Sequence, residues 1–534
     1  MIATTLEIRM GFHRRRFGHR PLTMVCALAL SAGILTTGTA LARPMAVPQK
    51  YFIDCSGESV ADEHAQPGTR ARPFTSLAQI NQRTLRPGSQ VYLARGMTCQ
   101  GTLVLNDSGT AARPVRVDAY GDPDRPAPRI DAAGAQQAVL VSDAEYVHVT
   151  DLELTAPGDN SAPRRGVYVL AKDTGPIHGI ELRGLAIHDV RGVVNGPRTG
   201  NGKFGAASGG IVVEAQGTTT PTWYENLRIE DNNLRAVDRE GIYTWSNWCR
   251  RPELGDFWDD VCDAPYAPSR GTIIRGNRLS DIGGDGIAVK MNNNALVEHN
   301  TLAGFNMRSG TYNAGMWTAN SEDVTFQYNE ASGGHTTLDG MAWDVDHATR
   351  GIVYQYNLSH DNEGGWLLLC PTSTGIRDFV VRYNISINDR FRGVENCSGH
   401  IASGAVHNNT VYIGDGVSQV VVNENNSQPR QVDFANNIIH KQGTGTASFR
   451  LRSGRFAFDH NLFYGVPQPP GAAASVLADP LFEAPGTNAS AGYHLRATSP
   501  ALGAGSLVPD TAAHDFFHTP VPQNEPPTIG AAQQ

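Results

Sequence analysis

VEHN (297–300), FQYN (326–329), YQYN (354–357) and VRYN (381–384) are four versions of one short segment that ends on asparagine. The same segment recurs as IEDN, IRGN, VHNN, FANN and FDHN, which end at Asn232, Asn277, Asn409, Asn437 and Asn461. After a first interval of 45 residues, the asparagines follow one another at 23 to 29 residues. Self-similarity with a period of about 20–50 residues indicates a repeat architecture. We therefore expect residues from about 146 to 465 to form one coil per repeat.

The content of each repeat predicts an all-β fold, a right-handed parallel β-helix. Apolar and polar residues alternate around each asparagine, as they do in half-buried strands, and we find no amphipathic helix of the kind that builds TPR, ankyrin or HEAT arrays. Propeller blades need about 40 residues, more than one repeat offers. Asparagine tolerates a positive φ in a turn, and stacked amides can hydrogen-bond from coil to coil. We interpret the asparagine column as structural.

The N-terminus has the features of an export signal over residues 1–42. A basic stretch at 14–17 precedes an apolar stretch at 22–35, and Ala40-Leu41-Ala42 is similar to a signal-peptidase site. An anchored helix and a twin-arginine signal remain alternatives. We expect a secreted or periplasmic protein that has no membrane segment after processing.

Six cysteines follow the signal, and they favour an oxidising compartment. Six cysteines allow 15 pairings, among which we prefer Cys55–Cys99, Cys249–Cys262 and Cys370–Cys397. The last two cysteines are 27 residues apart, about one coil, so they would lie on neighbouring strands.

Both ends of the chain resemble a known group of proteins. Residues 73–81 (PFTSLAQIN) predict a short N-terminal capping helix, with Thr75 or Ser76 as its cap. The stretch that contains it, 51–122, resembles the entry segment of secreted bacterial β-helix proteins related to polysaccharide lyases and glycosidases, and 499–533 resembles their closing segment. The resemblance to this pectate-lyase-like, carbohydrate-active superfamily implies a fold and a secreted location, but this fold carries several chemistries. We divide the chain into a signal (1–42), a cap with the first coils (43–130), the β-helix coils (131–465) and a closing segment (466–534).

A second recurrent element, glycine followed by an apolar residue, sets which side chains face outward. If the apolar residue points inward, the next residue points out. On this rule Met341, Trp343 and Val345 are core, while Ala342, Asp344 and Asp346 face solvent. The equivalent outward pairs on other coils are Tyr243 and Trp245, Ala288 and Lys290, Trp317 and Ala319, and Leu367 and Leu369.

The acidic residues cluster in two adjacent coils. The blocks DGMAWDVD (339–346) and QYNLSHDNEGGWLLLC (355–370) resemble a recurrent signature of carbohydrate-active β-helix proteins. Glycoside hydrolysis uses two carboxylates that flank the scissile bond, and residues two apart on a strand lie roughly 6.5–7 Å apart. We therefore predict Asp344 and Asp346 as the catalytic pair, with Asp339 and Glu363 as further catalytic candidates.

The same coils supply candidate substrate-binding residues. Trp245 and Trp317 are expected as platforms for sugar rings, and the aromatic, acidic loop 246–266 as a wall of the cleft. Polar contacts to substrate are expected from four residues, which are Lys290, His360, Asp285 and Glu240.

The leading functional hypothesis is a monomeric, secreted glycoside hydrolase that acts on a polysaccharide or oligosaccharide and requires no cofactor. The first alternative is a polysaccharide lyase with Lys290 as the base and Ca²⁺ as the cofactor, for which Asp361 is a candidate ligand. The second alternative is a non-catalytic glycan-binding or surface β-helix. Residues 43–534 carry 39 basic and 51 acidic side chains, a formal charge of −12, which argues against nucleic-acid binding.

Overall fold

The computed structural model describes residues 48–57, 62, 64–194, 205–254, 262, 264–509 and 511–534. Residues 48–534 form one compact unit. The expected export signal lies outside the described residues. In the part of the chain that is described, no helix has the length and apolar character needed to cross a membrane.

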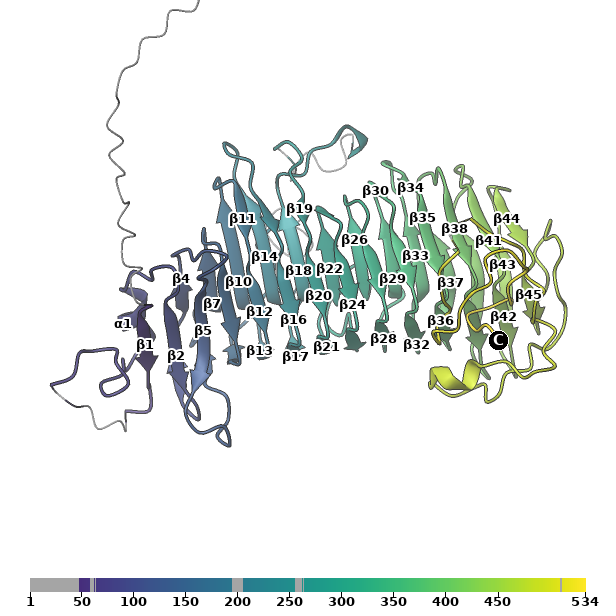
Figure 1. The fold of residues 1–534 in the computed structure, drawn as a ribbon. Coiled ribbons are helices and arrows are strands. Elements are labelled where there is room, and N and C mark those ends of the chain that lie inside the picture. Colours follow the sequence, from purple (N-terminus) through teal and green to yellow (C-terminus); the bar gives the residue numbers. More distant parts are fainter. Residues whose placement is uncertain are drawn as a thin grey trace, which may run out of the picture. The chain divides into compact units, whose positions relative to one another are not determined.

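The described residues form a solenoid with three long parallel sheets, here called sheets I, II and III (Figure 1). The 14 strands of sheet I are β1 (Lys50–Ile53), β2 (Gln90–Ala94), β5 (Val115–Tyr120), β8 (Val147–Thr150), β12 (Glu181–Arg183), β16 (Arg228–Glu230), β20 (Ile273–Arg275), β24 (Leu296–Glu298), β27 (Thr325–Gln327), β31 (Val353–Gln355), β35 (Phe379–Arg382), β38 (Gly404–His407), β41 (Val432–Ala435) and β44 (Phe456–Asp459). The 12 strands of sheet II are β4 (Leu103–Leu105), β7 (Gln137–Ser142), β10 (Arg165–Lys172), β14 (Gly209–Gln216), β18 (Glu240–Ser246), β22 (Ile287–Lys290), β26 (Met316–Ala319), β29 (Met341–Asp346), β33 (Gly365–Cys370), β37 (Phe391–Asn396), β40 (Gln419–Glu424) and β43 (Ala447–Arg450).

Sheet III follows sheet I in every coil. Its 13 described strands are β3 (Thr98–Gln100), β6 (Arg129–Asp131), β9 (Glu153–Ala156), β13 (Ala186–Val190), β17 (Asn233–Val237), β21 (Arg278–Ile282), β25 (Thr301–Ala303), β28 (Glu330–Ser332), β32 (Leu358–His360), β36 (Ile385–Ile387), β39 (Thr410–Ile413), β42 (Ile438–Lys441) and β45 (Leu462–Tyr464). Two small parallel sheets join β11 (Pro176–His178), β15 (Trp223–Glu225), β19 (Ser269–Arg270) and β23 (Asn292–Asn293), and β30 (Thr349–Arg350) with β34 (Ile376–Arg377).

The chain therefore runs from sheet I to sheet III to sheet II and back to sheet I, one coil at a time. Parallel strands joined by crossovers of this kind make the right-handed parallel β-helix that the repeat predicts. Alternate side chains point inward, and Trp343, Val345, Tyr354 and Trp366 lie in the main core, which runs through the solenoid.

The asparagine column lies at the corner between sheets I and III. Each amide Oδ1 accepts hydrogen bonds from the side-chain Nδ2 and the backbone N–H of the asparagine one coil before it. From Asn232 to Asn461 the side-chain bonds measure 2.8–3.1 Å. These asparagines are at most 2% exposed, so the predicted amide ladder is confirmed.

The expected positive φ belongs to a different residue. In every repeat the residue before the asparagine has the left-handed conformation, for example His299, Tyr328 and Tyr383 with φ of 55°, 55° and 51°. The asparagine side chain is held in place by its buried amide, whose oxygen and nitrogen both form hydrogen bonds along the column. The residue before it adopts the positive φ of the turn, so the prediction that the asparagine does so was wrong.

A short helix covers the N-terminal end of the solenoid. Helix α1 (Leu77–Asn81) buries Leu77 and Ile80 in the main core, and the side chain of Asn81 exchanges hydrogen bonds with Thr102 and Val104. Ser76 is its N-cap residue but makes no side-chain capping bond.

The closing segment does not simply plug the last coil. Its apolar residues Phe482, Tyr493 and Ile529 pack on Ile385 and Ile438, on the outer face of sheet III. Figure 1 shows this yellow segment running back across the green strands. A 3-10 turn at Ser490–Tyr493 belongs to it. The segment therefore covers the outer face of one of the three sheets.

Replacing Asn357 with alanine should interrupt the amide ladder. Its Oδ1 accepts from both the backbone N and Nδ2 of Asn329. Two buried donors would lose their acceptor, at about 1–3 kcal/mol each, so we expect the free energy of unfolding to fall by about 2–6 kcal/mol. Urea unfolding followed by circular dichroism measures this change. Asn425→Ala, at an exposed position, is the matched control and should change stability by less than about 0.5 kcal/mol. Equal midpoints for the two variants would contradict the role of the ladder.

Candidate active site

The outer face of sheet II carries two columns of side chains, set by the strand register. The first column contains Tyr243, Ala288, Trp317, Asp344, Leu368 and Glu395. Continuing the same register by two residues gives a second column of Trp245, Lys290, Ala319, Asp346 and Cys370. Neighbours in a column are one strand apart, about 4.8 Å. The aromatic residues, the lysine and the two predicted carboxylates therefore lie on one continuous face.

Lys290 lies inside an aromatic cage. Its Nζ is 5.3, 5.1 and 4.7 Å from the ring centroids of Tyr243, Trp245 and Trp317, and 3.5 Å from the Tyr243 hydroxyl. The lysine is only 2% exposed. Cation–π attraction is strongest for a desolvated ammonium, so the cage stabilises a charge that would otherwise be costly to bury.

Trp245 and Trp317 are not the open platforms that we predicted. They are 4% and 1% exposed, and Trp317 donates its indole N–H to Asp285 at 3.0 Å. Cys249, Leu254 and Cys262 pack in the same cluster. The described residues of the disulfide-closed loop pack against the two indole rings, because this contact removes apolar surface of both the loop and the rings from water. The wall predicted from 246–266 is thus a cover, in so far as its residues are described.

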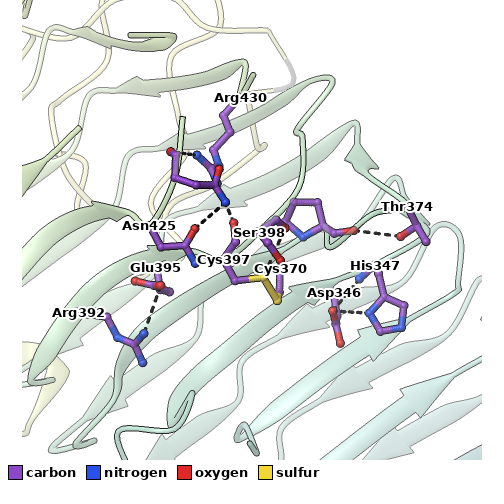
Figure 2. Close-up of a disulfide and its surroundings, with 12 residues drawn as sticks. Asp346, His347, Cys370, Thr374, Arg392, Glu395, Cys397, Ser398, Asn425 and Arg430 are labelled. Carbon is purple, nitrogen blue, oxygen red and sulfur yellow. Dashed lines mark hydrogen bonds and ion pairs between the residues drawn. A yellow bond between two sulfur atoms is a disulfide. The ribbon is translucent and has the colours of Figure 1, made fainter. Parts of the chain in front are cut away.

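Asp344 and Asp346 lie on the same face of β29, as predicted. They are only 4% and 9% exposed, so the prediction that they face solvent was wrong. Asp346 Oδ1 accepts hydrogen bonds from the backbone N–H of His347 at 2.8 Å and is 2.6 Å from His347 Nδ1. Figure 2 shows this pair beside the disulfide that joins Cys370 to Cys397. The two carboxylates share a face with the cage, and the ladder places only Ala319 between Asp346 and Lys290.

All three predicted disulfides are confirmed, namely Cys55–Cys99, Cys249–Cys262 and Cys370–Cys397. The last of these joins neighbouring strands of sheet II, immediately next to Asp346 in its column. It ties β33 to β37 at the point where the candidate site ends.

Glu395 is a carboxylate that we missed. It lies two strands from Asp344 in the first column, with only Leu368 between them. Arg392 Nη1 is 3.2 Å away from its Oε1, as Figure 2 shows. The glycine rule, applied to Gly393 and Val394, would have identified it, because the residue after the inward Val394 points out.

Glu214 is a second missed carboxylate on this face. It is fully buried, and it accepts hydrogen bonds from the Tyr168 hydroxyl at 2.9 Å and from Ala206 N–H at 2.7 Å. Through the ladder it lies next to Trp245. The hydrogen bonds hold the Glu214 carboxylate in place beside Trp245, which is one ring of the cage.

The predicted alternation of inward and outward side chains is broken near the starts of β29 and β33. Leu367 and Leu369 are core residues, and Leu368 takes the outward position because it pairs with Asp344. Ala342 is likewise in the main core, although we expected it to face solvent. The chain enters β33 through Gly365, which has a φ of 136°, a conformation open only to glycine. The glycine shifts the phase of the strand by one residue, which no simple alternation anticipates.

Asp339 and Glu363 lie in the turns before β29 and β33, and not on the face of the two strands. Asp339 has a φ of 62°, the left-handed conformation that aspartate tolerates in turns. Glu363 is about half-exposed and is 3.1 Å from His335 Nδ1. The strand geometry therefore sets these two apart from Asp344 and Asp346.

Glu240 and Asp285 form a buried structural network, contrary to their predicted role in binding substrate. Both are fully buried. Arg239 Nε is 2.9 Å from Glu240 and its Nη2 is 3.8 Å from Asp285, while Asp285 also accepts from Ala314 N–H and Trp317. A buried arginine must be paired, and these carboxylates are its partners.

His360 and Asp361 lie on a different face from the candidate site. His360 is in sheet III, where its ring contacts Glu330 at 3.2 Å and Asp361 at 2.9 Å. Asp361 also accepts a hydrogen bond of 2.7 Å from Asn488 in the closing segment. The pair helps to fasten the closing segment, and the roles predicted for His360 in binding substrate and for Asp361 in binding a metal stay predictions. Among the described residues, no group of three or more His, Cys, Asp or Glu side chains is placed to hold a metal ion.

The ion pairs of His360 should make stability depend on pH. Hydrogen bonds from the histidine to Glu330, and then to Asp361, raise its pKa from 6.5 to about 9. A raised pKa means that the stabilisation is fully present below pH 6.5 and is lost as the pH rises through about 9. We expect the melting temperature of His360→Gln to fall below that of the unmodified protein at pH 6, with the gap closing by about pH 10. A gap that is constant from pH 6 to pH 10 would refute this assignment.

Comparisons with known proteins find lacto-N-biosidases that are similar to most of this chain. No protein-family model matches it. A lacto-N-biosidase from Bifidobacterium longum subsp. longum is 27% identical in an alignment of 511 positions, which covers 80% of this chain and 31% of that protein. The crystal structure of a GH136 lacto-N-biosidase from Eubacterium ramulus is 25% identical, with a TM-score of 0.60, and the match covers 75% of this chain and 68% of that one. The chain is a homologue of these lacto-N-biosidases.

The likeness in structure confirms the right-handed β-helix that the repeat predicts. The chain spans about a third of the length of the curated relative that it matches.

Proposed function

We propose that this protein is a glycoside hydrolase that acts on an oligosaccharide or polysaccharide. The observation that carries the proposal is the pair Asp344 and Asp346, two carboxylates on one face of β29, beside the aromatic cage of sheet II. The lacto-N-biosidases that match most of this chain support hydrolysis over elimination.

The two carboxylates can divide the roles of hydrolysis between them. Asp346 Oδ1 accepts a hydrogen bond from the backbone N–H of His347 and contacts its ring, which orients that carboxylate, while Asp344 lies between Trp317 and Leu368 in its column. We infer that one of the pair protonates the leaving oxygen and that the other acts as base or nucleophile.

The position of Lys290 weighs against the lyase alternative. A base for β-elimination must reach a substrate proton within hydrogen-bond distance. The Nζ of Lys290 is instead directed at three aromatic rings, 4.7–5.3 Å from their centroids.

The location follows from the disulfides, for these are typical of oxidising compartments. We propose that the protein is secreted or periplasmic and works as a monomer. The absence of a requirement for a cofactor is part of the same proposal, since the two-carboxylate mechanism uses none.

A product assay tests the reaction class. The protein is incubated with a panel of neutral and acidic oligosaccharides and polysaccharides, and both reducing ends and the ultraviolet absorbance of an unsaturated uronate are recorded. We expect new reducing ends without the unsaturated product. If both signals rise together and a calcium chelator abolishes them, the protein is a lyase. Activity on no substrate of a broad panel would favour the non-catalytic alternative.

Variants of the two carboxylates test the site itself. Asp344→Asn and Asp346→Asn should each lower kcat/KM by about 10²–10⁴-fold, the range for the loss of a general acid or base, with little change in melting temperature. Asp433→Asn, at an exposed position in sheet I, is the matched control and should retain full activity. Turnover that survives in both site variants would move the active site elsewhere.

A further inference from the structure

A small cationic cavity lies at the end of β29, just beyond the candidate catalytic pair. Its volume is about 80 Å³. The lining includes Arg251, Arg350, Arg377 and His400, with Glu253 as the one carboxylate among the residues that line it. For a protein whose residues 43–534 carry a formal charge of −12, this concentration of positive charge needs an explanation.

The strand register brings two of the arginines together. Arg350 and Arg377 are direct partners in the parallel pair β30–β34, so their backbones are about 4.8 Å apart. Like charges directly opposite one another on neighbouring strands are destabilising. The fold therefore holds an arrangement that a bound anion would relieve.

The carboxylates nearby do not balance the arginines. Glu322 is 2.9 Å from Arg350 and 3.1 Å from Arg251, and Glu253 is 3.3 Å from Arg251. Among the ion pairs of the described residues, Arg377 takes part in none. Among the described residues, three arginines thus face two carboxylates. Glu322 is shared between Arg350 and Arg251, and Glu253 acts on both Arg251 and Arg377, so the described lining carries an excess of positive charge.

The cavity adjoins the catalytic strand through its own lining. Ala348 and Thr349 line it, and Thr349 donates its hydroxyl to the carbonyl of Asp346 at 2.6 Å. Arg251 Nη1 donates to the carbonyl of Ala348 at 3.5 Å. Figure 2 shows Thr374, which also lines the cavity, next to the Asp346–His347 pair. A sugar bound at Asp346 would have its neighbours within reach of the cavity.

We propose that this cavity is a subsite for an anionic substituent, a carboxylate or a sulfate group, on the glycan that the protein binds. The inference rests on the proposed function for its catalytic side, and it adds a substrate class, acidic glycans. Guanidinium groups form paired, charge-assisted hydrogen bonds with the planar or tetrahedral oxygens of such groups. A cavity of about 80 Å³ has room for a few water-sized atoms, which suits one anionic group while the sugar ring stays outside.

Binding measurements test the subsite without any need for turnover. The probes are sodium sulfate, glucuronic acid and N-acetylneuraminic acid, with glucose as the neutral control, titrated calorimetrically into the full-length protein at constant ionic strength. We expect at least one sugar acid to bind more tightly than glucose. The sulfate and carboxylate probes distinguish the two sources of negative charge.

Two variants with opposite expected effects on affinity test whether the sugar acids bind in the cavity. Arg377→Gln should weaken sugar-acid binding by about tenfold, as for the loss of a charged hydrogen-bond donor. Glu253→Gln should tighten it, because the one lining carboxylate repels the anion. Arg278→Gln, at an exposed arginine on sheet III, is the matched control and should leave the affinity unchanged.

Some outcomes would overturn the inference. Sugar acids that bind no better than glucose, or an Arg377→Gln variant that behaves like Arg278→Gln, would remove the subsite. Binding of inorganic sulfate without either sugar acid would mean that the cavity takes a free ion and not a glycan. If sugar acids bind through Arg377 but the product assay finds no hydrolysis, the subsite stands and the proposed function fails by itself.

Discussion

Each coil of this protein is held to the next, at the corner between sheets I and III, by a side-chain amide that bonds to its counterpart one coil away. The ladder runs through eight successive asparagine pairs, from Asn232 to Asn461. A buried amide with a missing partner is costly, so the column sets the register of every coil it joins. Since register determines which side chains share a column, the outer face of sheet II depends on the same bonds.

That face concentrates charge where water is scarce. Lys290 is buried among three rings, Arg239 among two carboxylates, and Asp344 and Asp346 are almost entirely covered. Electrostatic interactions are stronger in such surroundings than in water, which is the setting that acid–base catalysis exploits. The disulfide between Cys370 and Cys397 closes one side of the face, and the loop that carries Cys249 and Cys262 covers the other.

The remaining surfaces of the solenoid have separate roles. Sheet III is covered by the closing segment, to which Asp361 is bonded through Asn488. The arginine cavity opens from the small sheet of β30 and β34, beyond the last residue of β29. An enzyme with this fold can change its substrate through the short segments that extend beyond sheet II, such as β30 and β34 with Arg350 and Arg377, while the ladder and the two carboxylates stay in place.

The sequence by itself determined what repeats. The asparagine column, the disulfide between Cys370 and Cys397, the outward positions of Asp344, Asp346 and Lys290, and the core position of Trp343 all follow from a period that can be counted along the chain. The tertiary structure alone decided what depends on contacts between distant segments or on a local break in the period. The loop at Cys249 buries Trp245 and Trp317, the closing segment occupies Asp361, and Arg239 pairs with Glu240 and Asp285. Gly365 shifts its strand by one residue, so that Leu368 and not Leu367 lies beside Asp344. A sequence period predicts whether a side chain points inward or outward only while the strand alternates regularly. It does not predict which other segment of the chain will pack against that face.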